Sequence, residues 1–174
     1  MQTQTPFQRS AEARTRFPLH SFLVHFPVGL WLTSFILDAI VLVRPDQTLL
    51  AQTSTILLWA GVLSGAVAAL FGWRDYNTRV RVEHPEALRV ARVHLSLNVF
   101  LIFWYAVLAS LRTFRGFVFG TMTGLDFLMA AIGLGVLLRS AMLGGRLVFL
   151  YRIGQSPAEP GREGETRRPP ERAA

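Results

Sequence analysis

Four long apolar segments constrain this chain more than any other feature of its sequence. They cover residues 22–43, 49–71, 93–111 and 117–143, and most of the charged residues lie outside them. A helix that crosses a membrane needs about 20 mostly apolar residues, because the hydrocarbon core is about 30 Å thick and each helical residue rises about 1.5 Å. The sequence therefore predicts an all-α integral membrane protein, folded as a bundle of four transmembrane helices.

Composition supports this class and excludes several others. Of the 174 residues, 51% are hydrophobic and 17% are charged, whereas about 25% of the residues of a soluble domain are charged. The chain has no cysteine, which excludes disulfides, thiolate metal sites and cysteine nucleophiles. With four apolar segments in the chain, its net charge of +7 points to the lipid bilayer as partner and not to nucleic acid.

The segments predict one membrane domain, residues 17–154, between a cytoplasmic arm of residues 1–16 and a tail of residues 155–174. The tail is rich in Pro, Gly, Glu and Arg and has little to bury, so we expect it to be disordered. The first span is too long for a signal peptide and lacks a small-residue cleavage site, so we expect it to be retained. No internal repeat is evident from the sequence, which with only four spans disfavours a secondary transporter.

The arginines predict the orientation of the spans. All 18 basic residues are arginine; leaving Arg139 aside, 14 lie in the two terminal segments and the loop between spans two and three. On the other side there are only three: Arg44, Arg112 and Arg115. Basic loops stay in the cytoplasm. We therefore expect a multi-pass membrane protein with both termini cytoplasmic.

Histidines at the predicted cytoplasmic end are the candidate cofactor ligands. His20 and His25 lie at the start of the first span, and His94 begins the third. Ionisable groups at membrane depth are costly, so each is a functional candidate. At about 100° per residue, His20 and His25 point about 140° apart around the helix. They cannot face one ligand together unless the kink expected at Pro27 reorients one of them.

Three interpretations of these histidines stay open. In the first, His25 and His94 are the axial ligands of a b-type haem between spans one and three, with Asn98 and Tyr105 on the same face of span three. In the second, a divalent metal ion takes its ligands from four residues: His20, His25, His94 and Asp75. In the third, no cofactor is bound, and the histidines form hydrogen bonds between helices near the membrane interface.

Two acidic residues lie towards the opposite leaflet. Asp38 is deep in the first span and Asp126 is near the start of the fourth, too far from the histidines to share one site. We expect them either to hydrogen-bond each other or to pair with Arg112 or Arg115. The sequence contains no phosphate-binding glycine loop, nucleophile elbow or HExxH motif, so we expect a protein that is not an enzyme.

Four short motifs lie one after another along the predicted membrane domain. Residues 20–27 (HSFLVHFP) open the first span and residues 72–76 (GWRDY) close the second. His94 and Asn98 open the third span, and residues 144–148 (GGRLV) follow the fourth. In this set the chain resembles the bacterial membrane family known as domain of unknown function 2231, over about residues 17–154. Ser21 departs from the pattern, where the family more often has proline, and this alters the entry to the first span.

The resemblance implies a four-helix membrane protein and supplies no established activity. Some relatives are joined to Rieske-type or cytochrome-like domains, which implies an electron-transfer setting by analogy. The expected function is a non-enzymatic inner-membrane subunit of a respiratory or photosynthetic electron-transfer complex, with other transmembrane subunits as partners and b-type haem as candidate cofactor. The alternative is a purely structural accessory subunit without a cofactor.

Overall fold

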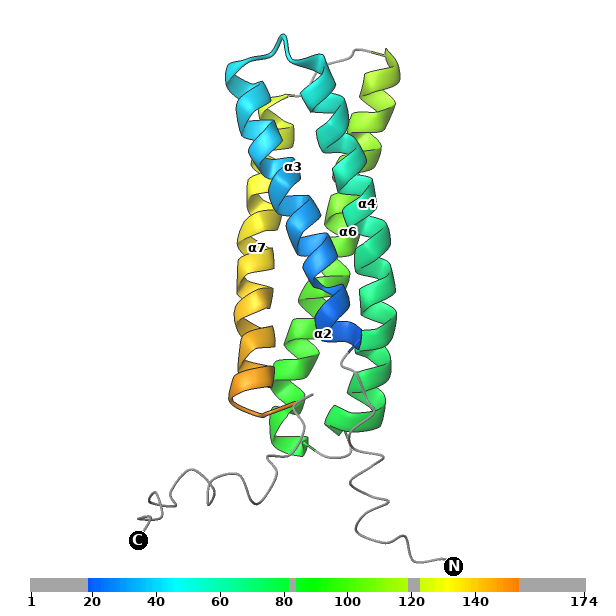
Figure 1. The fold of residues 1–174 in the computed structure, drawn as a ribbon, viewed down its shortest axis with the longest axis vertical. Coiled ribbons are helices and arrows are strands. Elements are labelled where there is room, and N and C mark those ends of the chain that lie inside the picture. The colour runs from blue at the N-terminus through cyan, green and yellow to red at the C-terminus, as the bar shows by residue number, and fades with distance from the viewer. Residues whose placement is uncertain (1–18, 82–83, 119–122, 154–174) are drawn as a thin grey trace, which may run out of the picture. The chain divides into compact units, whose positions relative to one another are not determined.

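The computed structural model describes residues 19–81, 84–118 and 123–153, which form long helices and no strand within these ranges (Figure 1). The predicted arm and tail, residues 1–16 and 155–174, lie outside the described residues. The helices are α2 (Leu19–Leu23), α3 (His25–Val43), α4 (Thr48–Asp75), α6 (Leu88–Val118) and α7 (Gly124–Phe149), with a π-helical turn η1 (Tyr76–Val80) and a 3-10 turn η2 (Pro85–Ala87).

Four helical stretches are long and apolar enough to cross a membrane, which confirms the predicted fold class. They are Leu19–Val43, Thr48–Thr78, Pro85–Arg115 and Gly124–Phe149. The helices run past most predicted span boundaries, because hydropathy marks the hydrocarbon-facing part while backbone hydrogen bonds continue into the polar flanks. The fourth helix begins later than predicted, at Gly124, because Thr123 and Asp126 form a capping box there.

The first span is interrupted at Val24, between α2 and α3. The interruption lies three residues before Pro27, and proline has no N–H to donate to the carbonyl of Leu23 one turn earlier. A kink at this place was expected from the sequence. It orients α2, which carries His20, separately from the rest of the span.

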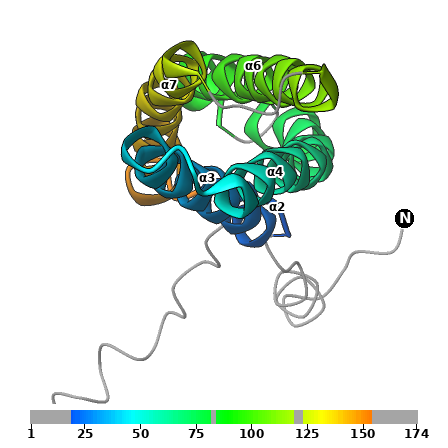
Figure 2. The same ribbon diagram turned by 90° about the horizontal axis from the view of Figure 1, so that it is seen from above.

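Neighbouring helices form a closed ring around the bundle axis (Figure 2). Helix α3 packs on α4, α4 on α6, α6 on α7, and α7 on α3. Helices α3 and α6 are therefore diagonal partners, and side chains that join them cross the centre of the bundle.

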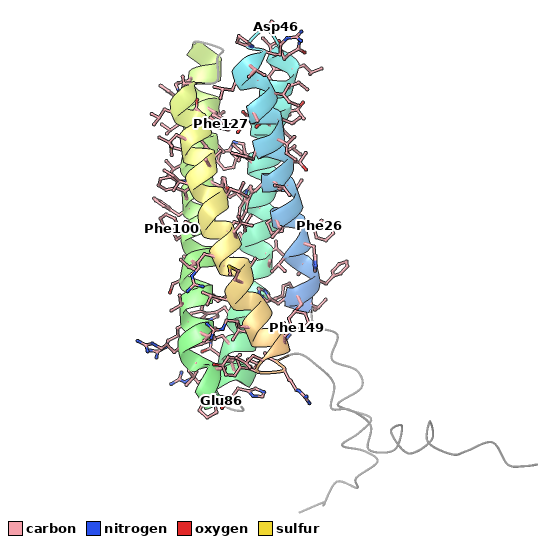
Figure 3. The ribbon with its side chains drawn as sticks, turned by 90° about the vertical axis from the view of Figure 1, so that its left-hand side faces the viewer. Phe26, Asp46, Glu86, Phe100, Phe127 and Phe149 are labelled. Atoms are coloured by element: carbon pink, nitrogen blue, oxygen red, sulfur yellow. The ribbon has the colours of Figure 1, made fainter. Side chains whose placement is uncertain are left out.

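Buried positions repeat at alternating intervals of three and four residues. On α6 they include Leu101, Tyr105, Leu108 and Arg112, and on α7 Asp126, Ala130, Gly133, Leu137 and Ser140. This is the spacing of an inward seam in a helical bundle. Phe26 and Phe100 lie off the seam and point away from the bundle (Figure 3), as expected for lipid-facing residues.

Glycines in the seam make room for large rings. The indole of Trp31 stacks on the ring of Tyr105 at the centre, with centroids 4.5 Å apart. A Cβ atom on Gly61 of α4 would lie 2.3 Å from Nε1 of Trp31, and one on Gly133 of α7 would lie 2.7 Å from Cζ of Tyr105. Each ring therefore lies directly on the backbone of a neighbouring helix.

The hairpin of α2, α3 and α4 and the hairpin of α6 and α7 make the same contacts, so the expectation that the chain has no internal repeat is wrong. Three central pairs join residues 74 positions apart: His20 with His94, Trp31 with Tyr105, and Asp38 with Arg112. On α4 and α7 the equivalent residues are 72 positions apart: Gly61 and Gly133, Ala68 and Ser140, Gly72 and Gly144. Three of the six pairs differ in residue type, and the offset changes from 74 to 72 between the two helices of a hairpin, which hid the repeat in the sequence.

Candidate functional site

Two histidines from diagonal helices meet at one end of the bundle, which we call the histidine end. Nδ1 of His20 on α2 donates to the carbonyl of Ala68 at 2.9 Å, and Nδ1 of His94 on α6 donates to the carbonyl of Ser140 at 2.9 Å. Their ring centroids are 6.4 Å apart and the planes cross at 82°. We call His20 and His94 the histidine pair.

These hydrogen bonds determine where each imidazole carries its proton. A carbonyl oxygen only accepts, so Nδ1 must be the protonated nitrogen in a neutral ring. Nε2 of each ring then has a lone pair. Equivalent helices supply the carbonyls, since Ala68 on α4 corresponds to Ser140 on α7.

Each ring of the histidine pair packs against a glycine of a neighbouring helix. A Cβ atom on Gly72 would lie 2.8 Å from Cε1 of His20, and one on Gly144 would lie 3.0 Å from Cε1 of His94. Both glycines open a motif that was singled out in the sequence. Their role here is to leave space for an imidazole, a role that the sequence did not reveal.

Asn98 lies one helical turn from His94 and belongs to the same cluster. Its amide nitrogen donates to Nε2 of His94 at 3.1 Å and to the backbone carbonyl of His94 at 2.8 Å. The predicted association of these two residues is therefore present.

His25 does not lie opposite His94, and this part of the sequence prediction is wrong. The His25 side chain is exposed, and its Nδ1 donates to the carbonyl of Phe22 in the preceding turn at 3.1 Å. His20, one heptad before the buried Pro27, lies in the seam. The prediction therefore placed the wrong histidine inside the bundle. Once the structure shows that Pro27 and Ser34 are buried, counting one heptad back from Pro27 identifies His20.

Tyr105 is distant from the histidine pair, contrary to the predicted site. It lies on the same face of α6 as His94, but about 16 Å further along the helix. Its hydroxyl donates to the carbonyl of Ala130 at 3.4 Å. Tyr105 therefore belongs to the central packing layer.

The divalent-metal alternative lacks a converged ligand set. In residues 19–81, 84–118 and 123–153, no group of three or more His, Cys, Asp or Glu side chains is arranged to hold a metal ion. His25 is exposed and its Nδ1 bonds the carbonyl of Phe22 on α2, so it does not join His20, His94 and Asp75 around one point.

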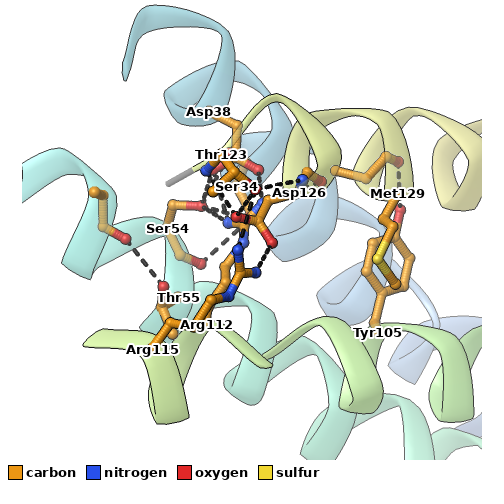
Figure 4. Close-up of polar contacts among 12 residues, drawn as sticks. Ser34, Asp38, Ser54, Thr55, Tyr105, Arg112, Arg115, Thr123, Asp126 and Met129 are labelled. Carbon is orange, nitrogen blue, oxygen red and sulfur yellow. Dashed lines mark hydrogen bonds and ion pairs between the residues drawn. The ribbon is translucent and has the colours of Figure 1, made fainter. Parts of the chain in front are cut away.

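A second polar cluster occupies the other end of the bundle, which we call the ion-pair end (Figure 4). Arg112 on α6 donates from Nη1 to Oδ1 of Asp38 at 2.9 Å and from Nη2 to Oδ2 at 2.7 Å. Nη1 also donates to Oγ of Ser54 on α4 at 3.0 Å, and Ser54 bonds Asp38 and Ser34. One guanidinium thus links three helices at the core.

Asp126 on α7 pairs with the other arginine of α6. Arg115 forms an ion pair with Asp126, and its Nη1 donates to Oγ1 of Thr123 at 3.1 Å. Asp126 also accepts the backbone N–H of Thr123 at 2.8 Å. The expected pairing of Asp38 and Asp126 with Arg112 and Arg115 is confirmed.

Comparison with known proteins places the chain in a family. The family model described as "Predicted membrane protein (DUF2231)" matches residues 16–157, which is most of the chain. This chain belongs to the DUF2231 family. No curated protein matches it, and no solved structure matches it.

The motifs of this DUF2231 chain converge in space at the histidine end. His20 comes from the first motif, Gly72 from the second, His94 and Asn98 from the third and Gly144 from the fourth. The cluster offers two imidazoles, each with Nδ1 bonded to a backbone carbonyl of a neighbouring helix and each packed against a glycine. Chemically, an imidazole whose Nδ1–H is held by a carbonyl is suited to bind a metal through Nε2.

Proposed function

We propose that this membrane protein is a non-enzymatic subunit of an electron-transfer complex and that it binds one b-type haem through His20 and His94. The observation that carries the proposal is the pair of equivalent imidazoles, each donating Nδ1–H to a backbone carbonyl of a neighbouring helix. A ligating histidine typically donates its other ring N–H in this way, which fixes the ring and raises the basicity of the ligating nitrogen.

The number of ligands favours haem over a bare divalent ion. A haem iron already has the four porphyrin nitrogens and takes two axial ligands from the protein, as bis-histidine cytochromes do in helical bundles. A zinc ion takes three or four protein ligands. The histidine pair supplies two.

The distance between the imidazole rings of the histidine pair also supports haem. Two imidazoles bonded from opposite sides to one metal ion, at about 2.0–2.1 Å each, have centroids roughly 6.4 Å apart. The rings of His20 and His94 are separated by 6.4 Å. Coordination by His94 would replace the hydrogen bond that Nε2 accepts from Asn98, and the Asn98 amide would keep its bond to the His94 carbonyl.

The cellular context of the proposed haem is inferred from the family resemblance and from the distribution of arginines. The family resemblance implies electron transfer, and the arginine distribution favours a bacterial inner membrane with the histidine end cytoplasmic. The proposed partners are other transmembrane subunits of the complex. Mass spectrometry of proteins that co-purify in mild detergent tests this part.

The alternative is a structural subunit without a cofactor. The same two hydrogen bonds tie α2 to α4 and α6 to α7, and this alone would stabilise the packing at the histidine end.

Absorption spectroscopy separates the two functions. The protein, expressed with ample haem and purified, is expected to show the sharp reduced-minus-oxidised spectrum of low-spin bis-histidine iron. His20→Ala and His94→Ala should each abolish it. His25→Ala is the matched control and should leave it unchanged, because His25 faces outward near the same end.

Two results would refute haem binding at this site. One is a wild-type protein without a haem spectrum, which would favour the structural function. The other is loss of the spectrum in His25→Ala together with its retention in His20→Ala, which would restore the pair expected from the sequence.

A further inference from the structure

Helix α7 carries an arginine in an unusual place. Arg139 is exposed on the outside of the bundle, within the apolar stretch Gly124–Phe149. It lies about 15 Å along the helix from Phe149 and about 20 Å from Asp126. An α7 of this length exceeds a hydrocarbon core of about 30 Å, so a centred core would place Arg139 about 10 Å inside its boundary.

The described residues around Arg139 offer it no counter-charge. Leu138 and Met142 beside it are 60% and 65% exposed, as expected for lipid contacts. Among the described residues, no Asp or Glu side chain forms an ion pair with Arg139. A charged group in this position is costly unless an anion or water reaches it.

Arg146 is the second cation on the same face. It follows Arg139 by seven residues, which is two helical turns, so the two side chains start on one side of α7 about 10 Å apart. Arg146 is also exposed and lies near the end of the helix. A phosphate drawn to the membrane boundary is within reach of both long side chains, and guanidinium groups bind phosphate with paired hydrogen bonds.

We infer that Arg139 and Arg146 bind the phosphate of an anionic phospholipid at the histidine end of α7. The acyl chains lie along the exposed face that includes Leu138 and Met142. A lipid is the source because Arg139 lies within the apolar span, where free phosphate does not penetrate. The site does not depend on the proposed haem.

The internal repeat provides a matched control. At the equivalent positions α4 carries Val67 and Arg74, so that helix has the arginine near its end but an apolar residue in place of Arg139. If paired arginines make the site, α7 binds the lipid and α4 does not.

Thermal unfolding of the full-length protein in detergent tests the inference. Added phosphatidylglycerol should raise the melting temperature more than phosphatidylcholine does, and inorganic phosphate at the same concentration should not raise it. Arg139→Gln should lose most of the phosphatidylglycerol-specific rise and bind that lipid about fivefold more weakly in native mass spectrometry. Arg74→Gln should keep the rise, and Val67→Arg should add lipid binding.

Equal responses to the two lipids would overturn the inference. So would an unchanged response in Arg139→Gln, or an equal loss in Arg74→Gln, which would indicate a diffuse basic surface. Haem content, measured in the same samples, should be the same in Arg139→Gln and wild type, so failure of the lipid site is distinguishable from failure of the haem site.

Discussion

Asp38 and Arg112 illustrate at residue scale what a buried charge requires. Their side chains are 0% and 5% exposed, yet each is held by the other through two hydrogen bonds, and Ser54 bonds both. Removing charges from water is expensive, and the mutual attraction offsets that cost only when the geometry is good. The pair fixes the register of α3 against α6 at the ion-pair end.

Asp38→Ala should destabilise the protein by about 3–5 kcal/mol, because it leaves the Arg112 guanidinium buried without its partner. The double variant Asp38→Leu with Arg112→Met should lose less, since it removes both charges. Thermal unfolding in detergent measures the difference. The matched control is Asp46→Ala, which removes an exposed pair with Arg44 (side chains 62% and 65% exposed) and should have little effect. Equal losses in the single and double Asp38 variants would contradict this account.

Helix α4 shows what determines the packing face of a helix whose sequence is not strongly amphipathic. Gly61 and Gly65 lie against Trp31, and Gly65 also lies against Ile102. Gly72 lies against His20. In lipid, close contact between backbones and rings replaces the hydrophobic drive that packs helices in water. The small residues therefore select the inward face of the helix.

Gly65→Leu should force α4 away from its neighbours. A Cβ atom at Gly65 would already lie 3.3 Å from Cη2 of Trp31 and 3.4 Å from Cγ1 of Ile102. Overpacking of this kind costs about 1–3 kcal/mol, which should appear as a lower melting temperature in detergent. Gly135→Leu on α7 is the control, because a Cβ atom there meets nothing within 4 Å. If both variants melt alike, the face at Gly65 is not tightly packed.

On the scale of the whole molecule, the two hairpins form repeats whose first helices start at the same end. His20 and His94 both lie near the start of their span, and Asp38 and Arg112 both lie towards its far end. Parallel repeats of this kind relate the halves by an axis along the membrane normal. The pairs His20–His94, Trp31–Tyr105 and Asp38–Arg112 join equivalent positions across the bundle.

The orientation of the whole bundle in the membrane is a further prediction. Arginines concentrate in the segments at the histidine end, so that end and both termini should be cytoplasmic. A reporter that is active only in the cytoplasm should work when fused after Ala174 and fail when inserted beside Asp46, which lies at the opposite end (Figure 3). The reverse pattern would overturn the arginine argument.

The sequence by itself was sufficient for the number of spans and the helical class. Length and hydropathy decide whether a helix can span a membrane, and neither depends on neighbouring helices. Because an unpaired carboxylate at this depth is costly, the sequence also required a partner for Asp38 and Asp126, and the structure shows that the partners are Arg112 and Arg115.

Only the tertiary structure decided which face of each helix points inward. In water the apolar face of a helix identifies its buried side, but a membrane helix is apolar on its lipid side as well, so hydrophobicity leaves its rotation about its own axis undetermined. His20 and His25 were therefore equivalent candidates until Gly72 and Ala68 were brought beside His20. The repeat was not recognised in the sequence because some equivalent positions carry different residues, as Trp31 and Tyr105 or Asp38 and Arg112 do, and only their contacts across the bundle show that they correspond.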